Sequence, residues 1–506
     1  IYNCSFAKIN TVDAFAECLY ILMCGTGFGF SVEQEEVGKL PVIPEISSGQ
    51  ALKKVVIEDS KAGWADSVRT LMQSLYAGQN VYFDYSEIRL EGARLKTMGG
   101  RASGPQPLVK LHDFIRETMH NAQGRQLTSL EAHDICNQIA EIVVVGGVRR
   151  SSQISLSDLH DKDMRHAKEW PFPIKRAMAN NSAIYREKPS AGEFLTEWAA
   201  LALSGSGERG IFNLEAAQNK APSRRYAPLI QGTNPCGEIM LRDMEFCNLS
   251  EVVVRAEDDL DTLLDKVETA TWLGVIQSSF TNFPYLRETW KKNCDKECLL
   301  GVSLTGQMDN PSILSSDALK ALKSRVIRIS RKASGILNTK MPTATTCVKP
   351  SGTVSQLVDS ASGVHPRYSQ YYIRRYRISA NDPLFKMMKD VGVPCSPENG
   401  QTEEDANTWV LEFPVKSPDT IPDKFALIVP DIIRLLPTVN EPLTVAAPKT
   451  WRGVVGVVIP IPKRPVGVKV IRVPDKPFPF IQKKLPVAAF ELAAVSYTHL
   501  TLPTKA

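Results

Sequence analysis

The chain has 506 residues, of which 43% are hydrophobic and 23% are charged, a composition typical of a globular protein with a buried core. Its net charge of +5 is small against 60 basic and 55 acidic side chains, so charge gives no reason to expect a nucleic-acid or membrane partner. No apolar run reaches the roughly 18 residues of a membrane helix, and no secretory signal opens the sequence. Because Ile1 already begins a strand-like segment, we expect the natural N-terminus to be missing.

The first thirty residues predict a strand, a helix over Thr11 to Met23 and a glycine-rich turn that leads into an extended segment. Thr11 or Asp13 could cap the helix. The glycine spacing in "GTGFGF" is not GxGxxG, so dinucleotide binding is only weakly indicated. The glycine-rich stretch from Ile88 to Leu108 is either a surface loop or a backbone that closely approaches a ligand.

Helical and strand-like patterns alternate through the middle of the chain. The segment Ile135 to Leu156 reads as a helix that runs into a Gly-Gly break. Short apolar segments follow at Met178 to Tyr185 and Gly207 to Leu214, and an acidic start precedes a helical pattern from Leu260. This alternation predicts an α/β fold whose sheet is buried on both faces.

The composition changes after about Pro418. Residues 419–506 contain 13 of the 33 prolines and no cysteine. Prolines this frequent are unsuited to a central sheet, and the segment is too apolar for a linker. We therefore divide the chain into residues 1–418 and a tail, 419–506, which we expect to be a frameshift or sequencing artefact rather than an evolved domain.

Ten cysteines are expected to be thiols, because the chain is long and no signal peptide directs it to an oxidising compartment. One of them, in "NPCGEI", has an unusual setting. If the segment is extended, Asn234, Cys236 and Glu238 share one face, and Cys247 could lie beside them on the next strand. An amide, a thiol and a carboxylate together suit a pocket that binds hydroxyls and moves a proton. The alternative is a strand whose polar face is simply solvated.

The segment "KPSGTVS" contains hydroxyls and a glycine backbone that suit a phosphate, if a helix begins there. The alternative is an ordinary helix cap. Cys294 and Cys298 could supply half of a zinc site, but no second pair is nearby, so we expect no metal. His365 could be a base, but a structural or cofactor-contact role is equally compatible with its setting.

Several segments together resemble the monomeric, adenosylcobalamin-dependent (class II) ribonucleoside triphosphate reductases. They are "TNPCGEIML", "EFCNLSEVVV", "YNCSF", "IRLEGARLKTMGGRASGP", "VVVGGVRRSSQISL", "ANNSAIY", "LLGVSLTGQMD" and "TATTCVKPSGTVSQLVDSASGVHPRYSQYYIRR". The resemblance covers roughly Ile1 to Pro418. It implies a ten-stranded α/β barrel made of two antiparallel halves, as in the glycyl-radical enzymes, with Cys236 on a finger loop inside the barrel.

The resemblance implies a role for each residue of the site. Cys236 would carry the thiyl radical that removes hydrogen from the ribose 3′ carbon, and Glu238 would take the 3′-hydroxyl proton. Asn234 would hydrogen-bond the sugar. Cys4 and Cys247 would supply the reducing equivalents and become a disulfide.

The resemblance also implies ligands and partners. Adenosylcobalamin would initiate the radical, and the substrate would be a ribonucleoside triphosphate reduced for DNA synthesis. Further partners would be a deoxynucleotide effector, whose site we cannot place, and a thioredoxin-type reductant. The protein would be a cytoplasmic monomer that binds neither nucleic acid nor membrane. The residues implied to bind the substrate phosphates are Ser351, Gly352, Thr353, Val354 and Ser355.

Other interpretations stay open. The family re-reduces its disulfide with two cysteines on a C-terminal tail, and this chain has none after Cys395, so we expect substrate binding without repeated turnover. The iron-dependent class would need adjacent tyrosines near the C-terminus, and Tyr371-Tyr372 lies well inside the chain. The glycyl-radical class would need a C-terminal glycine motif. Non-enzymatic alternatives are a damaged paralogue that only binds nucleotides and a zinc-binding structural protein.

Overall fold

The computed structural model describes residues 2–47, 54–95, 101–145, 148–149, 151–380, 382–398, 401–404, 406 and 408–418. The predicted boundary near Pro418 falls at the end of this part, so the interpretation of residues 419–506 lies outside the described residues. Residues 96–100 of the glycine-rich stretch also lie outside them.

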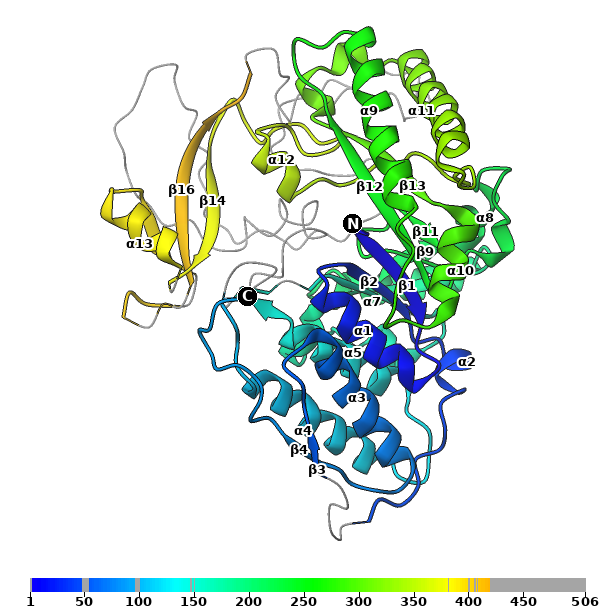
Figure 1. The fold of residues 1–506 in the computed structure, drawn as a ribbon, viewed down its shortest axis with the longest axis vertical. Coiled ribbons are helices and arrows are strands. Elements are labelled where there is room, and N and C mark those ends of the chain that lie inside the picture. The colour runs from blue at the N-terminus through cyan, green and yellow to red at the C-terminus, as the bar shows by residue number, and fades with distance from the viewer. Residues whose placement is uncertain are drawn as a thin grey trace. The chain divides into compact units, whose positions relative to one another are not determined.

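The central element of the described chain is a seven-stranded sheet. Its strands are, in spatial order, β13 (Leu300–Thr305), β12 (Glu245–Val253), β1 (Cys4–Lys8), β2 (Gly27–Ser31), β7 (Gln153–Asp158), β8 (Ala179–Tyr185) and β9 (Gly210–Asn213). The five strands from β1 to β9 are parallel, whereas β12 is antiparallel to β1 and parallel to β13. Figure 1 shows β1 lying between β12 and β2. The predicted α/β class is thus confirmed, and a closed ten-stranded barrel remains a prediction.

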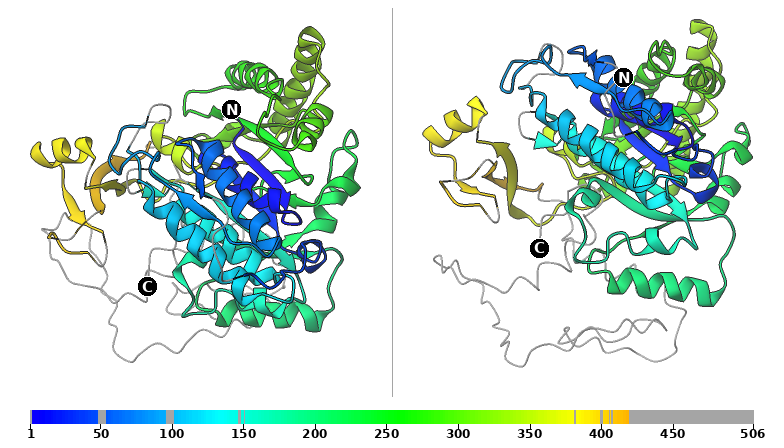
Figure 2. Two further views of the ribbon diagram at one scale, coloured as in Figure 1. Left: turned by 60° about the horizontal axis from the view of Figure 1, so that its bottom comes forward. Right: turned by 90° about the horizontal axis from the view of Figure 1, so that it is seen from below.

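Hydrophobic side chains cover both faces of the sheet, as expected for parallel strands. On one face Phe28 and Phe30 are fully buried among helices. On the other face Phe6 packs in a separate cluster with Cys4 and Cys247. The first of these faces is covered by α1 (Val12–Met23), α3 (Lys61–Tyr76), α4 (Gln106–Asn121) and α5 (Ser129–Ile142), the blue and cyan helices that lie together in Figure 2.

Two further helices cover the end of the sheet that contains β12 and β13. Helices α9 (Leu260–Ser278) and α11 (Ser316–Leu337) pack against each other and against β12 and β13. The remaining helices are α2 (Gln34–Val37), α6 (Lys162–Arg165), α7 (Ala191–Leu203), α8 (Leu214–Asn219), α10 (Glu288–Glu297), α12 (Thr353–Leu357) and α13 (Pro383–Asp390). Among the described residues no helix combines the length and apolar character that a membrane crossing requires.

Short strands complete the fold. The pairs are β3 (Lys54–Val56) with β4 (Tyr82–Asp84), β5 (Val144–Val145) with β6 (Val148–Arg149), and β10 (Gly232–Thr233) with β11 (Met240–Leu241). A separate three-stranded sheet has the order β14 (Tyr371–Ser379), β16 (Thr408–Lys416) and β15 (Cys395–Pro397).

Several helix starts follow from local sequence, whereas the start of α1 does not. Asp259 caps α9 and Thr128 caps α5 in capping boxes, which satisfy backbone N–H groups that have no partner in the helix. Thr11 stands at the N-cap of α1, one of the two predicted positions, but its side chain makes no capping hydrogen bond. Its hydroxyl instead accepts a hydrogen bond from Arg287 Nη1 at 3.1 Å, a tertiary contact that competes with the cap.

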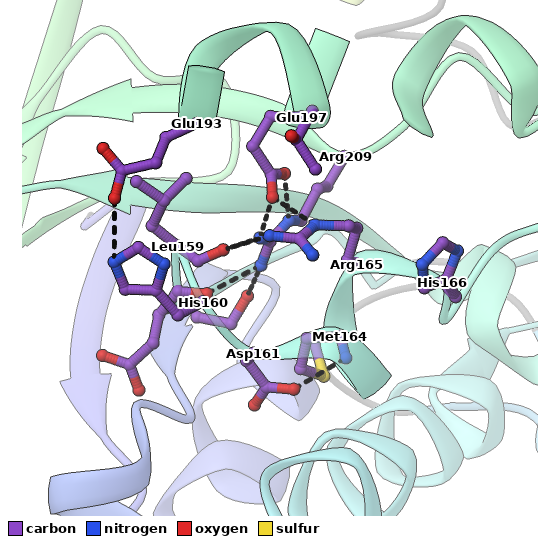
Figure 3. A network of polar contacts seen from close by, with 12 residues as sticks. Leu159, His160, Asp161, Met164, Arg165, His166, Glu193, Glu197 and Arg209 are labelled. Carbon is purple, nitrogen blue, oxygen red and sulfur yellow. Dashed lines mark hydrogen bonds and ion pairs between the residues drawn. The ribbon is translucent and has the colours of Figure 1, made fainter. Parts of the chain in front are cut away.

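A buried ion network attaches α7 to the end of β7 (Figure 3). The Glu197 carboxylate accepts hydrogen bonds from Arg165 and from Arg209, whose Nε and Nη2 lie at 3.1 and 3.0 Å. Arg209 Nη1 also donates to the Asp158 carbonyl at 2.8 Å. Glu197 is the buried residue of α7, so this helix is held by charge rather than by an apolar stripe.

We expect Glu197→Ala to lower the free energy of unfolding by about 3–5 kcal/mol, because it leaves two arginines without their shared carboxylate. Urea unfolding followed by circular dichroism measures this. The exposed Glu187 provides the matched control, and Glu187→Ala should change stability by less than about 0.5 kcal/mol. Equal small effects of both variants would contradict a stabilising role for the network.

Candidate active site

The "NPCGEI" segment is the loop of the β10–β11 hairpin. The expectation that Asn234, Cys236 and Glu238 lie on one face of an extended strand is wrong, because the backbone turns at Pro235 and Cys236. The Gly237 N–H donates to the Asn234 carbonyl at 3.0 Å, and Gly237 has φ +78°, which favours glycine. The turn still brings the amide and the carboxylate together, because it folds Glu238 back towards Asn234.

Two glycines allow this hairpin to lie directly on the sheet. A Cβ at Gly29 of β2 would come within 2.0 Å of the Thr233 carbonyl oxygen, and one at Gly232 would overlap the Phe6 ring at 2.2 Å. A side chain at either position would push the hairpin away from β1 and β2. The predicted turn and extended segment at "GTGFGF" therefore form the surface on which the loop rests. We assign this segment no role in dinucleotide binding.

The Asn234 side chain connects three parts of the site. Its Oδ1 accepts from the Ile239 backbone N–H at 3.0 Å, which fixes the orientation of the amide. Its Nδ2 therefore donates to Glu238 Oε2 at 2.8 Å and to Cys4 Sγ at 3.1 Å. Since Asn234 is fully buried, this amide is a fixed donor within the site.

Cys4 and Cys247 face each other across the two antiparallel strands. They are direct partners in the β1–β12 register, where Cα atoms are typically about 4.5–5.5 Å apart, a separation that a disulfide can bridge. Both are free thiols and almost completely buried. Burial, together with the adjacent Cys4, raises the pKa of Cys247 well above its ordinary value, so that Cys247 is a protonated thiol at neutral pH.

Cys236 is less enclosed than that pair. It is partly exposed, and Gly237 beside it is exposed, with open space where a Cβ would be. Burial raises the pKa of Cys236, Lys349 opposes the shift, and Glu238 and Cys4 add to it. The net rise keeps the S–H bond intact at neutral pH, which is the form that can give up a hydrogen atom.

Sequence reasoning did not identify two further residues that the fold brings to this site. Lys349 Nζ lies 2.8 Å from Glu238 Oε1, and Cys347 lies in the apolar cluster that contains Cys4 and Cys247. Both follow Thr346, and Thr346 forms a β-bridge with Val302 of β13. Their alternation at positions i and i+2, immediately before "PSGTVS", was the available signal.

The predicted phosphate segment, "KPSGTVS", begins at Lys349. A short helix, α12, does start at Thr353 as expected, and Val354 is exposed on it. Ser351 donates to Glu251 Oε2 at 2.8 Å, and Ser355 donates to the Ser351 carbonyl at 2.7 Å. The two serine hydroxyls are therefore engaged within the protein. The side chain of Thr353 lies outside the described residues.

Four buried ionisable side chains hold the hairpin and β12 in place. Glu297 accepts from Arg225 Nε at 2.7 Å and from Arg242 Nη2 at 2.5 Å, and Arg225 also contacts Glu245 at 3.1 Å. Burial raises the pKa of Glu245 to about 8, with Arg225 opposing and Glu297 adding to the shift. Arg242 follows β11 and Glu245 begins β12, so the cluster fixes the turn between the Cys236 loop and Cys247.

The other candidate sites gain no support from their surroundings. Cys294 is buried inside α10, whereas Cys298 is the C-cap residue with φ 46°, so the two thiols do not lie on one helical face. In the described part of the chain no three His, Cys, Asp or Glu residues are grouped so that they could hold a metal ion. The His365 N–H donates to the Ser362 carbonyl at 2.8 Å, which fits a turn.

Comparison with known proteins points in one direction, although no family model matches the chain. The adenosylcobalamin-dependent ribonucleoside-triphosphate reductase of Levilactobacillus brevis is 29% identical over 473 residues, which cover 78% of this chain and 61% of that protein. The enzyme of the same name from Lactobacillus acidophilus is 30% identical over 413 residues, covering 73% and 54%. A crystal structure of a B12-dependent (class II) ribonucleotide reductase superposes with a TM-score of 0.67 and 25% identity, covering 83% of this chain and 70% of the other.

The chain is homologous to the adenosylcobalamin-dependent ribonucleotide reductases. It spans about three fifths of the length of the Levilactobacillus brevis relative. The predicted resemblance is thus confirmed at the level of sequence and fold. The individual roles of Cys4, Asn234, Cys236, Glu238 and Cys247 remain predictions that this geometry now allows to be tested.

We expect mild oxidation of the folded protein with diamide to form a Cys4–Cys247 disulfide, because these thiols are strand partners. Peptide mapping under non-reducing conditions would show the linked peptides with a mass loss of about 2 Da. Cys294 and Cys298, which are not strand partners, serve as the internal control and should remain unlinked. Oxidation that leaves Cys4 and Cys247 unlinked would contradict the register.

Proposed function

We propose that this chain carries the catalytic region of an adenosylcobalamin-dependent ribonucleoside-triphosphate reductase, which converts ribonucleotides to 2′-deoxyribonucleotides for DNA synthesis. One observation supports this most strongly. A partly exposed thiol, a carboxylate and a fixed amide stand on one loop beside a buried pair of facing thiols. Homology to enzymes of that name supports the choice of substrate and cofactor.

The proposed chemistry assigns one task to each residue. Cys236, as a thiyl radical, takes the hydrogen atom from the 3′ carbon, and Glu238 takes the proton of the 3′-hydroxyl. The 2′-hydroxyl leaves as water with a proton from the Cys4–Cys247 pair. These thiols give up two electrons and become a disulfide, and Cys236 returns the hydrogen atom. Nucleotide and dithiol thus yield deoxynucleotide, disulfide and water.

The open side of the loop is compatible with a bulky cofactor. Gly237 presents no side chain and is exposed, with open space where a Cβ would be, so the loop leaves room beside it for a large group. Bound adenosylcobalamin supplies the organic radical that oxidises a cysteine, chemistry that side chains do not provide unaided. On the protein's side the requirement is a protonated and accessible thiol, which Cys236 meets.

The finer elements of the proposal follow the homologous enzymes. Ser351, Gly352, Thr353, Val354 and Ser355 would bind the substrate phosphates, which requires Ser351 to release Glu251. A closed ten-stranded barrel would enclose the loop as a finger. A deoxynucleotide effector, a thioredoxin-type reductant and a monomeric state belong to the same proposal.

Single-turnover reduction tests this function. Pre-reduced protein is mixed with adenosylcobalamin and a ribonucleoside triphosphate, and deoxynucleotide is measured by chromatography. Cys236→Ser should abolish product, and Glu238→Gln should slow its formation by about 10²–10⁴-fold, the usual contribution of a general base.

Cys24, an exposed thiol, provides the matched control, and Cys24→Ser should react like the parent protein. A parent protein that binds nucleotide but forms no deoxynucleotide would support the alternative of a nucleotide-binding paralogue. Product formation by Cys236→Ser would contradict the assigned radical site.

A further inference from the structure

Lys349 occupies a position between two parts of the site that come from distant segments. Its Nζ lies 2.8 Å from Glu238 Oε1 on the hairpin loop, while its own backbone N–H donates to Ser303 Oγ of β13 at 3.0 Å. Two residues later, Ser351 donates to Glu251 of β12. The lysine is thus anchored by its backbone to the sheet and reaches across to the loop with its side chain.

The Glu238 carboxylate is held from both sides. Oε2 accepts from Asn234 Nδ2 at 2.8 Å, and Oε1 faces the Lys349 ammonium. The Glu238 side chain is only 4% exposed, against 23% for Lys349. A carboxylate buried to this degree is costly unless a counter-charge compensates for its lost hydration.

The other ionisable groups named here that face this ion pair are thiols and a carboxylate, so the positive charge comes from Lys349. Cys236 lies on the same loop, Cys4 on β1, Cys247 on β12 and Cys347 on the segment of Lys349 itself. Burial raises the pKa values of Cys236, Cys247 and Cys347. Glu251 faces Lys349 from β12, and burial raises its pKa, with Ser351 and Lys349 opposing the shift.

The Lys349 ammonium is the positive partner of this ion pair. Burial acts to lower its pKa, and the Glu238 carboxylate, 2.8 Å from Nζ, acts to raise it. An ammonium paired with a carboxylate at this distance is favoured in its charged form. It is the fixed positive charge against which the carboxylate is placed.

We infer that Lys349 is a positioning residue that keeps the Glu238 carboxylate ionised and holds it beside Asn234 on the Cys236 loop. The inference deepens the proposed function and rests on it for the catalytic meaning of Glu238.

The direction of the electrostatic effect is fixed by the ion pair. Removing a cation 2.8 Å from a buried carboxylate favours the protonated acid. The base function of the carboxylate is present above its protonation midpoint and lost as pH falls through it. In Lys349→Met this loss should therefore begin at a higher pH than in the parent protein.

The test is a titration of the Glu238 carboxyl by ¹³C NMR in protein labelled at glutamate Cδ, with the signal assigned by its absence in Glu238→Gln. Lys349→Met should move the midpoint upward by about 1–3 pH units, the usual effect of one adjacent opposite charge. Lys349→Arg, which keeps the charge, should have a midpoint close to that of the parent protein. Lys332→Met, at an exposed lysine of α11, should leave the midpoint unchanged.

A second measurement follows catalysis rather than protonation. The acid limb of the pH profile of the single-turnover rate should move to higher pH by the same amount in Lys349→Met. In Lys349→Arg it should lie close to that of the parent protein. If Lys349→Met does not fold, Lys349→Gln provides the same comparison.

The two proposals fail in different ways. An unchanged NMR midpoint in both uncharged variants would overturn the role of Lys349, even in a protein that makes deoxynucleotide. A shifted midpoint in a protein that makes no deoxynucleotide would support the role of Lys349 and contradict the proposed reductase.

Discussion

The antiparallel pairing of β1 with β12 is the contact on which the rest of the site depends. It joins five parallel strands to a second parallel pair, and it places Cys4 directly opposite Cys247. The β10–β11 hairpin can then rest on β1 and β2, because Gly29 and Gly232 have no side chains to keep it away. A shift of one residue in this register would move Cys247 to the other face of the sheet and separate the thiols.

Within this frame, polar contacts rather than apolar packing set the geometry of the loop. Asn234 connects the carboxylate to Cys4, and Lys349 holds the same carboxylate from the opposite side. The buried network of Arg225, Arg242, Glu245 and Glu297 holds the chain between the loop and β12, so a movement of this chain would disturb the ion pairs of Glu297. Such networks contribute little net stability but strongly favour one arrangement. This suits a site whose reactive thiol must stay aligned with a proton acceptor.

Sequence patterns predicted the first helix, the helix near Ile135 and the helix from Leu260, and they singled out the segment that is now proposed as the reaction centre. They could not predict the path of "NPCGEI", because the extended interpretation rested on alternation, whereas Pro235 and Gly237 make a turn. They also missed Lys349 and Glu251, since each acquires its role from a partner about a hundred residues away. Thr11 illustrates the same limit, because a contact with Arg287 replaced the local cap. Local chemistry indicated which residues could react, and tertiary pairing decided which residues hold them.

The central claim is that this loop and the facing thiols form one reaction centre in which Cys4 and Cys247 are the reductant. The most direct measurement counts the Cys4–Cys247 disulfide formed for each deoxynucleotide, by mass spectrometry of a quenched single turnover. The account predicts one disulfide per deoxynucleotide, rising together with product. Deoxynucleotide formed while Cys4 and Cys247 remain reduced, or a disulfide that appears without product, would contradict it.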